Sequence, residues 1–154
     1  MKKKILIGII LLFSITSFSQ NYSNAVGLRG GFASGITFKH MLGEKAGFEF
    51  IADSRWGGGS ITGLYEIHAQ AFAVDGLNWY YGFGGHIGSY RANKNNNYFN
   101  DARTVIGIDG ILGIEYNIAE IPINISLDYK PAFNLTGYTG FWGDNGALSV
   151  RYYF

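Results

Sequence analysis

The sequence of 154 residues contains no cysteine and only two prolines. Without cysteine the chain can form no disulfide framework, no thiolate metal site and no lipid anchor on a cysteine. Beyond the first twenty residues there is no uninterrupted run of 18 apolar residues, which is about the length that a membrane-spanning helix needs. Any membrane span after that point must therefore consist of strands.

The N-terminus has the order of a secretory signal. A basic start, Met1 to Lys4, is followed by an apolar segment from Ile5 to Phe13 and by small residues up to Ser19. This order predicts a signal peptide at 1–19 that is cleaved, and a single mature domain at 20–154. The alternative, an uncleaved anchor, conflicts with the shortness of the apolar segment. Cleavage removes three lysines and changes the formal charge from +1 to −2, so we expect no nucleic-acid partner.

What the chain does contain is glycine and aromatic residues: 23 glycines and 17% aromatics. Both favour strands and tight turns over helices. Eight segments alternate between apolar and polar residues and are separated by glycine, asparagine or acidic turns. We expect strands at about 25–33, 35–42, 47–56, 60–72, 77–90, 102–117, 123–135 and 146–154.

The seventh segment shows the alternation most clearly. Apolar residues occupy every second position from Ile123 to Leu135, and polar or small residues occupy the positions between them. Strand side chains alternate with this period of two. Pro131 is the one residue that does not suit a central strand, because it cannot donate a hydrogen bond to its neighbour.

Alternation alone does not say which face lies inside a barrel. A soluble lipocalin-like carrier would have its apolar face inside, whereas a membrane barrel has it outside. Side-chain volume decides, because an eight-stranded barrel has room inside for few large side chains. The apolar face carries fourteen aromatics, which would overfill it: Phe32, Phe38, Phe48, Phe50, Trp56, Tyr65, Trp79, Tyr81, Phe83, Tyr116, Tyr129, Phe133, Tyr152 and Phe154. The polar face, in which glycine makes room for long side chains, is predicted to line the lumen.

Connection lengths agree with a barrel whose termini both lie in the periplasm. The connections 42–46, 73–76 and 118–122 are short, while 91–101 and 136–145 are the longest. The long connections carry aromatic residues that are candidates for contact with an extracellular partner, since aromatics are favoured at interfaces: Tyr98, Phe99, Tyr138, Phe141 and Trp142. The alternative is that they dock at the lipid headgroups.

The C-terminal strand carries Leu148, Val150, Tyr152 and Phe154 on one face and ends on that phenylalanine. This series resembles the terminal strand of Gram-negative outer-membrane barrels, which the barrel assembly machinery recognises. Together with the eight alternating segments, the chain resembles the small eight-stranded outer-membrane barrel family that includes the OmpA membrane domain and OmpX. The resemblance implies a cell outer membrane location, outer-membrane lipid and the assembly machinery as partners, and no cofactor.

The polar face carries a nearly balanced set of charges, which are predicted to form a salt-bridge network that plugs the lumen, since enclosed charges must be paired or hydrated. The set comprises Arg29, Lys39, Glu49, Asp53, Arg55, Glu66, His68, Asp109, Glu115, Asp128, Lys130 and Arg151, with His86 on the same face. A narrow gated pore for small ions is the alternative. Symmetric pairing of the last two strands predicts that Asp128 faces Arg151, and Lys130 is predicted to reach Asp109 on the sixth strand.

The histidines do not form a metal site in this arrangement. The predicted register separates His68 and His86 by on the order of 17 Å along the barrel, too far to share an ion. Instead His68 is expected to hydrogen-bond Glu49. No serine, histidine and acid constellation is evident, so we expect no enzymatic activity. The sequence therefore predicts an all-β, eight-stranded, antiparallel up-and-down transmembrane barrel with a structural or surface-interaction role.

Overall fold

The computed structural model describes residues 23–55, 57–91, 102–137 and 139–154. The predicted signal peptide, Trp56 and the loop aromatics Tyr98, Phe99 and Tyr138 lie outside these residues. No helix in the described ranges is long and apolar enough to cross a membrane.

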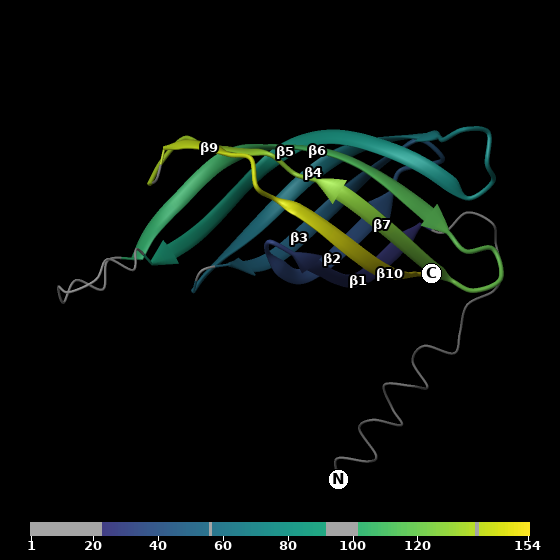
Figure 1. Cartoon of the computed structure of the whole chain (residues 1–154), viewed down its shortest axis with the longest axis horizontal. Coiled ribbons are helices and arrows are strands. Elements are labelled where there is room, and N and C mark those ends of the chain that lie inside the picture. Colours follow the sequence, from purple (N-terminus) through teal and green to yellow (C-terminus); the bar gives the residue numbers. More distant parts are fainter. Residues whose placement is uncertain (1–22, 56, 92–101, 138) are drawn as a thin grey trace, which may run out of the picture.

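The described residues form a single sheet of ten strands that curves into a barrel (Figure 1). The strands are β1 (Asn24–Gly31), β2 (Ser34–Met41), β3 (Ala46–Arg55), β4 (Gly58–Gln70), β5 (Leu77–Arg91), β6 (Ala102–Asn117), β7 (Ile123–Tyr129), β8 (Ala132–Asn134), β9 (Gly140–Trp142) and β10 (Gly146–Tyr153).

Closure of the barrel comes from the pairing of its first and last strands. Each strand from β1 to β6 pairs antiparallel with the next, and β10 pairs with both β7 and β1. Asn24 and Phe154 exchange backbone hydrogen bonds of 3.1 and 2.8 Å. The start of β1 and Phe154 therefore meet at one end of the barrel, which we call the near end; the opposite end is the far end. The predicted eight-stranded antiparallel up-and-down fold is confirmed.

The seventh and eighth strands of the wall differ from their predicted form, because both are interrupted at the same level. Lys130 and Pro131 separate β7 from β8, and residues 143–145 separate β9 from β10. Pro131 has no N–H to donate, so the ladder breaks there, although its carbonyl still accepts from Gly110 N at 2.9 Å. The segment 140–142, predicted as loop, is strand β9 because it pairs with β8.

The apolar face lies outside and the polar face inside. Leu28 is 70% exposed and Phe83 68% exposed, whereas Lys39 and Glu49 are 1% and 0% exposed. This is the reverse of a lipocalin-like carrier and the arrangement predicted from side-chain volume. The lumen is filled by charged and polar side chains and by one small apolar cluster.

Candidate functional site

The lumen holds two polar clusters separated by apolar side chains. Three strands carry the same order from the near end to the far end: Glu49, Ile51 and Asp53 on β3; Glu66, Leu64 and Ser60 on β4; Glu115, Ile111 and Asp109 on β6. The middle members Ile51, Leu64 and Ile111 pack with Tyr80 as a buried cluster. We call the groups on either side the near-end cluster and the far-end cluster.

Lys39 is at the centre of the near-end cluster. Its Nζ lies 2.9 Å from Glu66 Oε2, 3.2 Å from Glu115 Oε2 and 3.9 Å from Glu49 Oε2. The Tyr80 ring completes its surroundings, with 4.2 Å from Nζ to the ring centroid. A buried ammonium ion is tolerated only when it is paired and hydrogen-bonded in this way.

Arg151 connects the same cluster to the opposite wall. Its guanidinium donates to Glu49, which also accepts from the Thr37 hydroxyl. It donates further to Ser126 Oγ at 2.6 Å and to Asn124 Oδ1 at 3.1 Å. One arginine from β10 thereby ties β3 to β7 across the lumen.

His68 lies between two carboxylates of the near-end cluster. Its Nδ1 is 3.0 Å from Glu115 Oε1 and its Nε2 is 3.3 Å from Glu66 Oε2, and its ring stacks on Tyr80. The predicted hydrogen bond from His68 to Glu49 is wrong, because the register places Glu49 opposite Leu64, four residues along β4 from His68.

Arg29 and Asp128 form the central ion pair. Arg29 donates two hydrogen bonds, of 2.5 and 2.7 Å, to the two carboxylate oxygens, and Tyr80 Oη donates a third of 3.0 Å to Oδ2. The predicted pair of Asp128 with Arg151 is therefore wrong. Since β9 extends the last hairpin, its turn lies closer to residue 137, and the register places Asp128 opposite Ala147 and Arg151 opposite Asn124.

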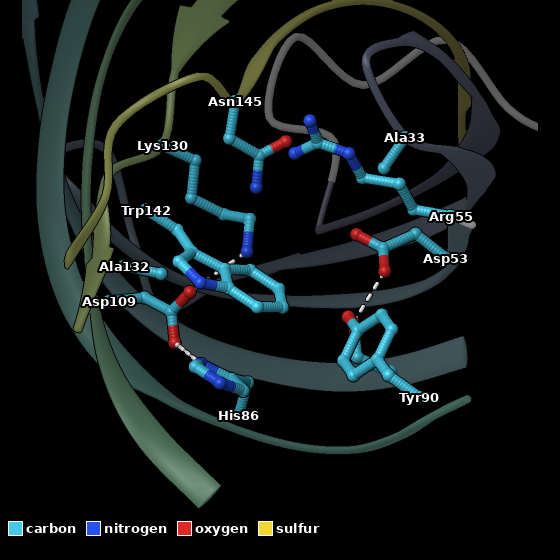
Figure 2. A pocket seen from close by; sticks show the side chains of 11 residues that line it. Ala33, Asp53, Arg55, His86, Tyr90, Asp109, Lys130, Ala132, Trp142 and Asn145 are labelled. Carbon is cyan, nitrogen blue, oxygen red and sulfur yellow. Dashed lines mark hydrogen bonds and ion pairs between the residues drawn. The ribbon is translucent and has the colours of Figure 1, made fainter. Parts of the chain in front are cut away.

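The far-end cluster is built around Asp109 (Figure 2). Lys130 Nζ lies 2.8 Å from Asp109 Oδ1, as predicted, and His86 Nδ1 lies 2.6 Å from Oδ2. The other ring nitrogen of His86 faces the side-chain amide of Asn134 at 3.0 Å. Asp53 accepts from Ser60 Oγ at 2.5 Å on the neighbouring wall.

Trp142 covers the far-end mouth of the lumen. Its ring meets the Tyr90 ring edge to face, with 5.3 Å between the ring centroids, and Figure 2 shows it beside Lys130 and Asp109. A cavity of about 20 Å³ remains among these side chains, Arg55 and Asn145, which is room for about one water molecule. Trp142 was predicted as a surface-loop residue; on β9 it points inward while its neighbour Phe141 points outward.

An ion pair spans the gap beside β9. Arg55 at the end of β3 donates hydrogen bonds of 3.2 and 2.5 Å to the two oxygens of Asp144. The hydrogen bond from Arg55 holds the pKa of the exposed Asp144 carboxyl below its ordinary value of 3.8. This pair fixes the segment between β9 and β10 to the opposite side of the mouth.

Lumen glycines leave the space that these long side chains occupy. A Cβ on Gly113 would lie 2.6 Å from Tyr80 Cζ, and one on Gly107 would lie 2.6 Å from His86 Cε1. A Cβ on Gly27 would lie 2.8 Å from Arg151 Cγ. Such distances are too short for any larger residue, so glycine at these positions is part of the lumen packing.

The twelve charged candidates lie inside the barrel or, for Arg55, at its mouth. The C-terminal residues Leu148, Val150, Tyr152 and Phe154 lie on the outer face of β10 and just beyond it. No group of three or more His, Cys, Asp or Glu side chains that could hold a metal ion occurs within the described ranges.

Tyr80 is the lumen residue that sequence reasoning missed. It is fully buried and contacts the near-end cluster, the central ion pair and the apolar cluster. The run Trp79-Tyr80-Tyr81 hides the alternation, because all three residues are aromatic. The available signal was the position of Tyr80 in the strand, because every second residue shares a face and Tyr80 therefore lies on the same face as Asn78 and Gly82.

Comparison with known proteins identifies the fold. No protein-family model matches the chain, and no curated protein matches it. Among solved structures, the crystal structure of the N-terminal β-barrel domain of Pseudomonas aeruginosa OprF is similar, with a TM-score of 0.67 and 14% sequence identity. The match covers 85% of this chain and 96% of that one. The chain has the fold of the OprF barrel domain. At this identity the likeness concerns the architecture.

Proposed function

We propose that the protein is an integral outer-membrane barrel with a plugged lumen, which serves as a structural or surface-interaction component of the cell envelope. The observation that carries this proposal is that the apolar face of the strands lies outside the barrel and the polar face lies inside. Leu, Ile, Val and aromatic side chains cover the outside, while Lys39, Glu49, Glu66 and Arg151 are fully buried inside. An apolar outer surface on a barrel that the pairing of β1 with β10 closes suits hydrocarbon, where backbone groups must be satisfied internally.

The proposed location and partners follow from the same surface. The N-terminal signal pattern supports export, and the outward series Leu148, Val150, Tyr152 and Phe154 supports recognition by the barrel assembly machinery. Outer-membrane lipid is the proposed partner of the apolar face. In this orientation the near end lies in the periplasm and the far end faces outward. Phe141, which is 65% exposed at the far end on the outer face of β9, is proposed to contact lipid rather than an extracellular partner.

The two polar clusters and the apolar cluster between them support a closed lumen rather than a pore. A water path would need to pass Ile51, Leu64 and Ile111, which are buried against Tyr80. It would also have to break the bidentate pair of Arg29 with Asp128. The proposal includes no enzymatic activity: the Asp109 and His86 pair faces an asparagine amide at 3.0 Å rather than a serine hydroxyl.

The proposal is tested by refolding residues 20–154 into detergent micelles and comparing gel mobility before and after boiling, with circular dichroism of the same sample. We expect a compact, faster-migrating unboiled form with a β spectrum that is absent without detergent or lipid. Folding in plain buffer alone would contradict the membrane assignment.

Deletion of Phe154 tests the proposed assembly signal. Expressed with its full N-terminus, the truncated protein should accumulate less in the outer membrane than the intact protein, while still refolding into detergent. Refolding of the truncated protein in vitro shows whether its barrel is still stable, so that a loss in the cell can be assigned to recognition by the assembly machinery. Equal accumulation of both proteins in the outer membrane would contradict the assigned role of the C-terminal series.

A further inference from the structure

The outer face of the barrel is hollowed by a groove in its far half. The groove has a volume of about 370 Å³ and lies over β5, β6 and β8, with Phe141 of β9 at its far end. Its walls and floor are apolar: Phe83, Ile108, Gly110, Pro131, Phe133 and Phe141. It belongs to the outside of the wall and is separate from the lumen clusters.

Two sequence features create this groove. Gly110 occupies an outward position of β6 opposite Phe83, where most outward positions carry a large apolar side chain. Pro131 interrupts the neighbouring strand, and its ring forms one side of the hollow, 3.6 Å from where a Cβ of Gly110 would lie. Phe133 and Phe141 stand opposite each other on β8 and β9 and continue the walls outward.

We propose that this groove is a binding site for one acyl chain of a lipid in the leaflet at the far end of the barrel. The inference rests on the proposed membrane location, because the groove is continuous with the face that hydrocarbon would cover. A flexible acyl chain can follow a narrow hollow between aromatic walls. Its methylene groups are surrounded by hydrocarbon both in the bilayer and in the groove, so the hydrophobic effect does not drive its binding. What it gains is close packing against Phe83, Phe133 and Phe141 that a smooth wall would not offer.

The lining argues for a hydrocarbon chain rather than a protein partner. Asp109 is the charged residue along the groove, and its carboxylate is turned into the lumen, where Lys130 and His86 bind it. The groove therefore offers no charged group and little polarity with which to orient a protein. A stable protein interface also needs on the order of 1,000 Å² of buried surface, far more than one narrow groove supplies.

The test fills the groove and counts the lipid that remains bound. Gly110→Leu places a side chain in the hollow, and Gly63→Leu is the matched control. Gly63 also faces outward opposite a phenylalanine, Phe50, and its Cβ would lie 3.7 Å from that ring, so both positions have room. Each protein is reconstituted with dipalmitoylphosphatidylglycerol, transferred to mild detergent and examined by native mass spectrometry.

We expect the unmodified protein and Gly63→Leu to retain one lipid. Gly110→Leu should retain several-fold less, because its side chain occupies the hollow in which the acyl chain would pack. Phe141→Ala, which removes one wall, should also reduce retention and provides a second variant if Gly110→Leu does not fold. Equal retention by all four proteins would overturn the proposal, as would a lipid-free dimer that Gly110→Leu converts to a monomer.

The same samples distinguish this inference from the proposed function. A barrel that folds only in detergent or lipid, shows heat-modifiable mobility and retains no groove-dependent lipid would contradict the acyl-chain site alone. A protein that folds in plain buffer would contradict the membrane assignment and the site together.

Discussion

The near-end and far-end clusters use similar residues, yet they are closed in different ways. In the near-end cluster, Lys39 is surrounded by three carboxylates and a tyrosine ring, and uninterrupted strands bring these groups together. In the far-end cluster the wall is interrupted at Lys130 and Pro131, a small cavity remains, and Trp142 and the ion pair of Arg55 with Asp144 cover it. A regular wall lets charges pack against each other, whereas an interrupted wall needs an additional cover.

The largest expected effect comes from removing the central charge of the near-end cluster. Lys39→Met should lower the free energy of unfolding by about 3 to 5 kcal/mol, because it leaves buried carboxylates without their cation. Urea titration of the detergent-folded barrel measures the change. Lys45→Met, in an exposed turn, is the control and should change stability little. Equal stability of the two variants would mean that the near-end cluster is hydrated rather than closed.

A smaller loss is expected from filling the space that a lumen glycine leaves. Gly113→Ala should lower the free energy of unfolding by about 2 kcal/mol, because the new methyl group overlaps the Tyr80 ring. Gly110→Ala, three residues away on the outer face, has room for its methyl group and is the matched control. The same titration compares them, and a larger loss at Gly110 would contradict the assignment of inner and outer faces.

Removing one hydroxyl tests the link between the near-end cluster and the central pair. Tyr80→Phe should cost about 1.5 kcal/mol, the lower end of the range for a hydrogen bond to a charged group, because Asp128 keeps both bonds from Arg29. Tyr81→Phe, on the outer face, is the control for loss of a tyrosine hydroxyl. If both variants unfold at the same urea concentration, the Tyr80 bond does not stabilise the lumen.

The pair of Arg55 with Asp144 at the far end should contribute least. Arg55→Met is expected to cost less than about 1 kcal/mol, because the carboxylate that it leaves unpaired is exposed to solvent and salt. The pKa of Asp144 is lower in the folded protein, so this contribution is present above pH 4 and is lost as the pH falls through the folded pKa. Unfolding at pH 7 and pH 3 should therefore differ less for Arg55→Met than for the unmodified protein. A larger pH dependence of unfolding in Arg55→Met would contradict the predicted direction of the Asp144 contribution.

Sequence reasoning predicted the architecture because apolar and polar residues alternate over most of each wall strand and the aromatic volume excludes an apolar lumen. It could not predict the pairing across the last hairpin. The segment 140–142 reads as loop, and its pairing with β8 shifts the register, so Arg29 rather than Arg151 binds Asp128. Trp142 faces inward because it lies on β9 opposite the lumen-facing Ala132. Contacts across a lumen depend on register and strand tilt, which alternation does not contain.

Apolar residues on the polar face were the second gap. The alternation of each strand places three apolar residues in the lumen: Ile51, Leu64 and Ile111. Nothing in their local sequence shows whether they form a packed layer or only interrupt the alternation of apolar and polar residues. Their common function emerges only when β3, β4 and β6 are aligned side by side, since the three side chains then meet at one level around Tyr80.

Ion conductance across a planar lipid bilayer tests the closed lumen most directly. The detergent-folded barrel, with heat-modifiable mobility shown for the same preparation, is inserted at increasing protein concentration under an applied voltage. The account predicts a current no larger than that of the bare bilayer, because the near-end cluster, the apolar cluster and the central ion pair fill the lumen. Stable unit steps of ion current that scale with the inserted protein would contradict it.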